Sequence, residues 1–195
     1  MMMLILGVAM SVLIIVYSFT GNNRLLAATL APRIGATVEE VRPARGRWKI
    51  SILLDLMFKR QPQIAPIAAD PAAFDHVLFI APLWDMAIAA PMAVAIRTLA
   101  PQLRSYAFAS FCGYDRPGQH DHVLAELNRI VGRPPTHATE LMTGRLVPPV
   151  DRDKISKVSA RRVLPEELVA FTAEIDSIVG WFHQAGALNA HVACD

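Results

Sequence analysis

The sequence predicts an α/β protein, a three-layer α/β/α sandwich around a five-stranded parallel sheet. Three runs, at residues 11–17, 76–81 and 106–111, are almost entirely apolar, as expected of parallel strands that are buried on both faces. Stretches with helical periodicity alternate with these runs, which is the pattern of βα units. With 195 residues, the chain is long enough for one domain with a substantial core.

The composition excludes several classes of protein. Hydrophobic residues make up 53% of the chain and the mean hydropathy is +0.34, which strands buried on both faces explain without a membrane. Charged residues make up 18%, too many for a polytopic membrane protein and too few for a disordered chain. The net charge of +2, without a Lys/Arg cluster interleaved with aromatic residues, does not indicate nucleic-acid binding.

The number and spacing of the cysteines and histidines indicate neither a metal site nor a disulfide framework. The two cysteines, Cys112 and Cys194, argue against a disulfide scaffold and fit a reducing compartment, so we expect a cytoplasmic protein. His120 and His122 lie two positions apart and cannot share one helix face, so we interpret them as surface histidines.

The amino-terminal stretch of residues 1–19 contains no charge and is long enough to span a bilayer. It lacks the basic start and the cleavage site of a signal peptide. A membrane span would use up residues 11–17, which we predict to be the first strand. We therefore expect residues 1–10 to be an apolar extension, or a start assigned upstream of Met10, with a membrane anchor as the less favoured alternative.

The first strand leads into a short polar loop at residues 18–23, and a helix follows until Pro32 stops it. A strand that feeds a hydroxyl- and glycine-rich loop into a helix is a recurring phosphate site, because free N–H groups and the helix dipole point at the anion. Ser18 and Thr20 can add hydroxyl donors, and Gly21 allows close approach of the backbone.

Residues 36–41 predict a short strand at the sheet edge, because Glu39 and Glu40 place a charge on each face. Residues 42–66 form a basic insert around an apolar segment at residues 50–58. We interpret that segment as a surface helix that covers one flank of the sheet, with a membrane- or partner-binding helix as the alternative.

The second buried strand, residues 76–81, ends in Pro82-Leu83-Trp84-Asp85-Met86, and Pro91 suits the first turn of the helix that follows. Trp84 at the end of a strand could stack on a planar ligand or cap the core. We favour the ligand because a phosphate-type loop precedes it in the chain.

The third buried strand ends in a turn-rich loop at residues 112–118. Gly113 can bring the backbone close to a ligand, and Tyr114 could stack on one. Cys112 is interpreted as a buried and inert thiol rather than a redox group. A helix at residues 120–131 follows.

Residues 136–142 predict the last strand, and residues 145–162 a solvated basic linker that could instead attract a nicotinamide phosphate or an anionic partner. Pro165 begins an amphipathic helix that Gly186 ends. We thus expect one domain over residues 11–186 and a flexible tail over residues 187–195.

The three loops together resemble those of the flavodoxin family. The phosphate loop of that family has a hydroxyl residue, any residue, Thr, Gly, any residue and then usually Thr or Asn, which here is Ser18-Phe19-Thr20-Gly21-Asn22-Asn23. The resemblance covers roughly residues 11–185 and implies the flavodoxin-like strand order 2-1-3-4-5. It also implies FMN as cofactor at the carboxyl ends of the first, third and fourth strands.

The resemblance assigns a role to each loop. The first loop would cradle the FMN phosphate, Trp84 and Tyr114 would flank the ring, and backbone groups of the other two loops would bond its polar edge. The implied cofactor-binding residues are Ser18, Phe19, Thr20, Gly21, Asn22, Asn23, Pro82, Leu83, Trp84, Asp85, Cys112, Gly113 and Tyr114.

Two departures from the family pattern bear on function. Many relatives have Gly where this chain has Asp85, and an aspartate near the ring would disfavour the anionic reduced flavin. Small electron-shuttling flavodoxins are typically acidic, whereas this chain carries a net charge of +2.

We find no nucleophile–base constellation, so the chemistry would belong to the flavin and no catalytic side chain is predicted. The leading hypothesis is an FMN-dependent oxidoreductase that passes electrons from NAD(P)H to a small acceptor such as a quinone. The close alternative is an electron-transfer flavodoxin between protein partners. The other alternative is a flavin-free module of the same fold that binds a partner or a membrane, motivated by the apolar amino terminus and the basic residues 42–60.

Overall fold

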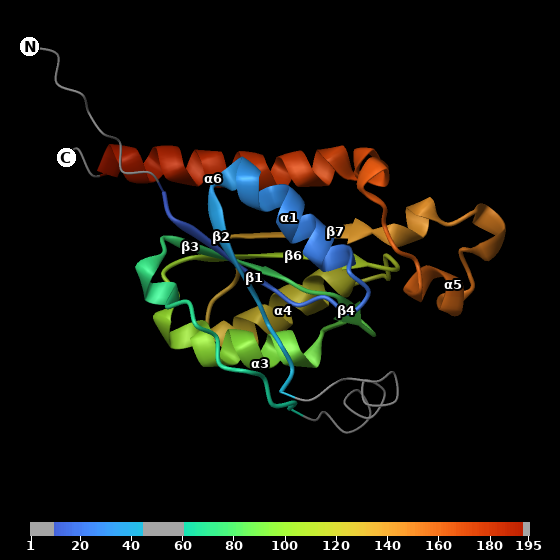
Figure 1. Ribbon diagram of the computed structural model, residues 1–195, viewed down its shortest axis with the longest axis horizontal. Coiled ribbons are helices and arrows are strands. Elements are labelled where there is room, and N and C mark those ends of the chain that lie inside the picture. Colours follow the sequence, from blue (N-terminus) through green and yellow to red (C-terminus); the bar gives the residue numbers. More distant parts are fainter. Residues whose placement is uncertain (1–9, 45–60, 193–195) are drawn as a thin grey trace, which may run out of the picture.

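The computed structural model of the chain describes residues 10–44 and 61–192 and contains one central five-stranded sheet (Figure 1). All of its strand pairs are parallel. The spatial order of the strands is β2 (Ala36–Glu40), β1 (Val12–Val16), β3 (His76–Ile80), β6 (Tyr106–Cys112) and β7 (His137–Met142). The parallel sheet and the predicted order 2-1-3-4-5 are confirmed, because these are the first to fifth main strands along the chain.

Burial along the strands explains their composition. Every residue of β1, β3 and β6 is buried, which matches their nearly continuous apolar sequences. Strand β2 is only partly buried and leaves Val38 44% exposed, as expected of an edge strand.

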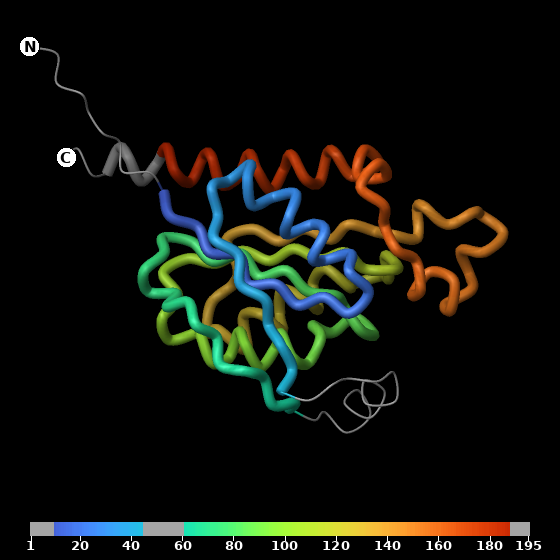
Figure 2. Tube along the Cα trace, in the orientation of Figure 1, coloured from blue at the N-terminus to red at the C-terminus, as the bar shows by residue number. Residues whose placement is uncertain are grey.

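Helices cover both faces of the sheet, which confirms the three-layer sandwich (Figure 2). Helices α1 (Asn22–Ile34) and α6 (Thr172–Val192) pack on one face, where Leu30 and Phe182 are fully buried. Helices α3 (Ala90–Leu99) and α4 (Gln119–Val131) pack on the other.

Three helix ends differ from the prediction. Helix α1 does not stop at Pro32 but continues to Ile34, because Pro32 lies in the last turn and removes a single backbone bond there. The segment that begins at Pro165 is a 3₁₀ helix, η5 (Pro165–Phe171), before α6 starts. Helix α6 then passes Gly186, which lies against Met10, and reaches Val192 rather than giving way to a tail at residue 187.

Three predictions fall wholly or mainly outside the described residues: the apolar extension at residues 1–10, the insert helix at 50–58 and the end of the tail at 193–195. The described ends of the insert pair with each other, since Ala65 N–H donates to Arg42 O over 2.7 Å. Within residues 10–44 and 61–192, no helix is long and apolar enough to cross a membrane.

Candidate functional site

Three loops meet at the carboxyl edge of the sheet, because neighbouring parallel strands end on the same side. We call residues 18–23, after β1, the first loop, and residues 82–86, after β3, the second loop. The third loop is residues 112–118, which begins with the last residue of β6. Register places the three strands side by side, so the sequence prediction that these loops share one edge is confirmed.

The first loop presents several unbonded N–H groups. Gly21 has a φ of 101°, which suits glycine, and its N–H donates to Ser18 Oγ over 3.1 Å. Leu25 N–H donates to Gly21 O over 2.9 Å and so starts the helical bonding of α1. In the described part of the chain, the N–H groups of Phe19, Thr20, Asn22 and Asn23 have no bonded acceptor. The loop can therefore donate to an anion at the positive end of α1.

The side chains of Asn22 and Asn23 have structural partners instead. Asn22 Nδ2 donates to Arg161 O over 2.8 Å, and Val163 N–H donates to Asn22 Oδ1 over 3.0 Å. Asn23 Oδ1 accepts from Phe111 N–H over 2.8 Å. These two buried side chains fix the first loop to distant segments, so only their backbone groups are available to a ligand.

The second loop is part of a small β-hairpin that the sequence analysis did not predict. Strand β4 (Leu83–Trp84) pairs with β5 (Ala87–Ile88) in antiparallel fashion. The two turn residues are left-handed, with a φ of 49° at Asp85 and 67° at Met86. Ile88 N–H donates to Glu126 Oε2 of α4 over 2.9 Å, which fixes the hairpin to the helix layer.

Trp84 joins the second loop to the first. Its ring meets the ring of Tyr17 edge to face, with centroids 6.0 Å apart, and the ring of Phe19 in the same way at 6.4 Å. Tyr17 ends the buried β1 run and Phe19 is 39% exposed. Phe19 and Trp84, which pack on the buried Tyr17, form an aromatic surface next to the unbonded N–H groups of the first loop.

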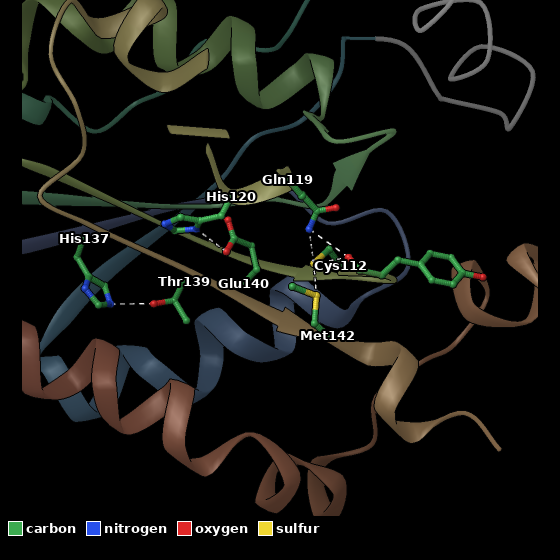
Figure 3. A network of polar contacts seen from close by, with 8 residues as sticks. Cys112, Gln119, His120, His137, Thr139, Glu140 and Met142 are labelled. Atoms are coloured by element: carbon green, nitrogen blue, oxygen red, sulfur yellow. Dashed lines mark hydrogen bonds and ion pairs between the residues drawn. The ribbon is translucent and has the colours of Figure 1, made fainter. Parts of the chain in front are cut away.

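Cys112 in the third loop is buried, as predicted. The thiol is buried, and this burial raises its pKa to about 12. Gln119 Nε2 donates to Cys112 Sγ over 3.6 Å, and Cys112 Sγ lies 3.2 Å from Met142 Sδ (Figure 3). A thiol that stays protonated in this way is a poor nucleophile and a poor redox group.

Two carbonyl groups of the third loop, those of Cys112 and Gly113, accept hydrogen bonds from residues 143 and 144. Thr143 Oγ1 donates to Cys112 O over 3.1 Å, and Gly144 N–H donates to Gly113 O over 3.0 Å. A Cβ atom at residue 144 would lie 2.6 Å from Gly113 O, so only glycine permits this contact. The N–H groups of Gly113 and Tyr114 have no bonded acceptor among the described residues, so the third loop can offer them to a ligand.

A cavity of about 430 Å³ lies beside the first loop, toward β2. It includes Ser18 and Phe19 of the predicted site, but no residue of the second or third loop. Its other lining residues are Tyr17, Arg24, Glu40, Val41, Arg42 and Pro43. Sequence reasoning missed these six, although the position of residues 40–43 could have been inferred, because the end of β2 must lie beside the end of β1.

Charges around the cavity are mainly positive. Arg24 forms an ion pair with Glu40, whereas Arg42 has no ion-pair partner in the residues that the structure describes. Across the site, Arg116 Nη1 of the third loop lies 2.7 Å from Asp85 Oδ1 of the second loop. Within the described ranges, no group of three or more His, Cys, Asp or Glu side chains could hold a metal ion.

The fold is shared with solved flavoproteins. A flavoprotein from Lactobacillus acidophilus NCFM, solved in complex with FMN, matches 76% of this chain and 100% of its own with a TM-score of 0.59 and 18% identity. The apo-form of the flavoprotein from that strain matches 76% and 98% with a TM-score of 0.51 and 24% identity. A candidate flavoprotein from Bacteroides eggerthii DSM 20697 matches 67% and 87% with a TM-score of 0.59 and 15% identity.

No protein-family model and no curated protein matches the chain. The similarity to these solved structures establishes the flavodoxin-like fold, in agreement with the strand order.

Proposed function

We propose that the protein is a flavodoxin-like flavoprotein that binds FMN and passes electrons from NAD(P)H to a small acceptor such as a quinone. One observation carries the cofactor assignment. The first loop offers unbonded N–H groups at the start of α1, in a fold shared with a flavoprotein solved in complex with FMN.

The phosphate end of FMN fits the first loop. The N–H groups of Phe19, Thr20, Asn22 and Asn23 and the Thr20 hydroxyl are donors without a bonded acceptor among the described residues. Arg42, which lines the adjacent cavity and has no ion-pair partner among the described residues, adds positive charge for a dianionic group, whereas the charge of Arg24 is offset by Glu40.

The second and third loops offer groups that can contact the ring of FMN. Trp84 offers an aromatic face, and Gly113 and Tyr114 offer N–H groups to the polar edge. The carbonyl groups of Cys112 and Gly113 already accept hydrogen bonds from residues 143 and 144, so we assign the N–H groups of this loop to the ring. FMN, when bound, supplies the electron-transfer chemistry, and the protein orients and tunes it.

The charge distribution supports a small acceptor rather than a large basic partner. The net charge is +2, and arginines line the cavity beside the first loop. A basic rim attracts anionic molecules such as a nicotinamide dinucleotide and repels basic redox proteins.

The experiment is to purify the protein, add FMN, desalt it and record the visible absorbance spectrum. Retained flavin bands are expected, with weaker retention in Thr20→Ala and Trp84→Ala and unchanged retention in Thr98→Ala, a control at an exposed hydroxyl on α3. Folded protein that retains no flavin would overturn the proposal.

A second assay tests the electron path. NAD(P)H oxidation that depends on added quinone would support the enzyme. Retained flavin without such turnover would refute the enzyme and leave an electron shuttle between protein partners.

A further inference from the structure

A buried polar cluster lies between β6, β7 and the first turn of α4, outside the loops described above (Figure 3). Ser110 of β6 and Glu140 of β7 are register partners, so their side chains leave the same face of the sheet. That face carries α4, because Phe108 and Ala138 pack with Val123.

Ser110 and Glu140 have unmet hydrogen-bonding capacity. Ser110 is fully buried, and the Glu140 side chain is 8% exposed. Neither Ser110 Oγ nor Glu140 Oε1 has a partner among the described residues. A buried hydroxyl beside a buried carboxylate oxygen is an arrangement that one ordered water can bridge.

His120 connects this cluster to solvent. Its Nδ1 lies 2.9 Å from Glu140 Oε2, and its side chain is 51% exposed on the first turn of α4 (Figure 3). Glu140 therefore has one oxygen on an exposed imidazole and the other in the interior. The carboxylate also fixes the orientation of the His120 ring.

The inner end of the cluster approaches the second loop. Ala81 N–H donates to Ala109 O over 3.2 Å, which places the start of the second loop at Pro82 beside Ser110 on the neighbouring strand. The hairpin lies on the same face of the sheet, since Ile88 N–H is bonded to Glu126 of α4.

We propose that His120, Glu140 and Ser110 form a proton path from solvent to the second loop, with one ordered water between Glu140 Oε1 and Ser110 Oγ. The inference rests on the proposed function, because the path needs a group beside the second loop that takes up a proton on reduction. FMN is such a group.

For each proton that enters from solvent at His120, one proton leaves at Ser110, and no electron moves along the path. Solvent protonates His120 Nε2, and the proton on Nδ1 passes to Glu140 Oε2. The carboxyl group of Glu140 then rotates to bring this proton to the inner side, and the proton passes through the water to Ser110, whose hydroxyl passes one proton on as it accepts one. Glu140 is left as a carboxylate again, and exchange of the imidazole tautomer resets the path.

Two groups next to the cluster, Cys112 and Gln119, take no part. Cys112 lies on the same face and is bonded to Gln119 and Met142 (Figure 3), and burial holds its pKa at about 12. Gln119 has no ionisable group, and it also donates to Tyr114 O over 3.1 Å.

The test follows proton uptake after photoreduction of protein-bound FMN, using an indicator dye in weak buffer. Glu140→Gln, His120→Ala and Ser110→Ala are each expected to slow uptake by at least about tenfold, in line with other positioned acid–base groups. Added imidazole should restore the rate in His120→Ala but not in Glu140→Gln. His122→Ala, on the same helix, and Glu174→Gln, in a surface ion pair, are matched controls that should behave like the wild type.

A flavin-free measurement tests the first step. Ring nitrogen signals should show that Glu140→Gln reduces the share of the His120 tautomer with its proton on Nδ1 and leaves the tautomers of His122 unchanged. Wild-type uptake in the path variants with FMN retained would overturn the proton path alone, whereas loss of FMN from the wild-type protein would overturn the proposed function. Because His120 is exposed, His120→Ala still tests the path if Ser110→Ala or Glu140→Gln, at buried positions, fails to fold.

Discussion

The guanidinium of Arg116 lies 2.7 Å from the carboxylate of Asp85, so an ion pair spans from the third loop to the turn of the hairpin. Asp85 is 75% and Arg116 42% exposed at the side chain, so the pair contributes little to stability. Its effect is electrostatic, because Arg116 offsets the negative charge that sequence analysis placed beside the ring.

Replacing Arg116 should therefore disfavour reduced FMN. In Arg116→Ala, the uncompensated Asp85 charge should weaken binding of reduced FMN about two- to fivefold more than binding of oxidised FMN, because the pair is exposed and screened. The reduction potential of the bound flavin would shift downward, measured by equilibration with a reference dye. Arg129→Ala on α4 serves as the exposed control, and an unchanged potential in Arg116→Ala would contradict the prediction.

Glycine at residue 86 should relieve the backbone strain of the hairpin turn. Met86 has a φ of 67°, a conformation in which a side chain is strained. Gly normally destabilises a chain relative to Ala, but here Met86→Gly should be about 1 kcal/mol more stable than Met86→Ala. Urea unfolding of both variants isolates the backbone effect because both lack the Met side chain. Greater stability of the Ala variant would show that the turn is not strained.

Asn22 should be essential for attaching the segment 143–163. Its side chain bonds Arg161 O and Val163 N–H, and both bonds are lost in Asn22→Ala. We expect a loss of about 2–4 kcal/mol in unfolding free energy, since two buried backbone groups lose their partner. Trypsin should also cleave at Arg152, Lys154 or Lys157 faster than in the wild type. Asn128→Ala, at an exposed site on α4, is the control, and cleavage at the wild-type rate would contradict the attachment.

Stability should fall as the pH drops from 7 to 5. Burial lowers the pKa of His76 and of His137 below the ordinary value, so the unfolded chain binds protons in this range that the folded chain does not. Each histidine can remove at most about 1.4 kcal/mol per pH unit below pH 6.5. The pKa of Asp75 is lowered by its bond from Ser11 N–H, and its contribution disappears only below about pH 4.

His76→Phe tests this account, because it keeps the edge-to-face ring contact with Trp181 and removes the titrating group. Urea unfolding at pH 7, 6 and 5 should give a shallower loss of stability than in the wild type. The exposed His122→Asn should follow the wild type, and an equally steep loss in His76→Phe would exclude His76 as a source.

Cys112 should resist thiol reagents in the folded state. With a pKa of about 12, its thiolate fraction at pH 8 is about a thousandfold below that of an unfolded cysteine. In a Cys194→Ser background, labelling by an aromatic disulfide should require urea. Rapid labelling of the native protein would show that the third loop opens.

The sheet could be predicted from the sequence because burial on both faces requires the nearly continuous apolar runs seen in β1, β3 and β6. The edge of the sheet that carries the site could then be predicted as well, because neighbouring parallel strands end on the same side. The hairpin was not predictable in the same way, because Leu83-Trp84-Asp85-Met86-Ala87-Ile88 contains no glycine or Asn-Gly turn signal.

The hydrogen-bond partners of Asn22 and Asn23 could not be predicted from the sequence either. The residues that they bond are 88 to 141 positions away, and local sequence patterns do not encode contacts at that separation. An asparagine in a phosphate-type loop looks the same in sequence whether its side chain faces a ligand or supports another loop. The individual site residues thus stay predictions until FMN retention is measured.

The position of β1 in the sheet has a consequence for biosynthesis. It is the first described strand to leave the ribosome, yet it lies between β2 and β3, and its partner in β3 follows 64 residues later. Until residue 80 has emerged, the five apolar residues of β1 lack one neighbour and remain open to pairing with other nascent chains. Translation products that stop before β3 should therefore aggregate, and productive folding should depend on chaperones that shield the amino-terminal strand.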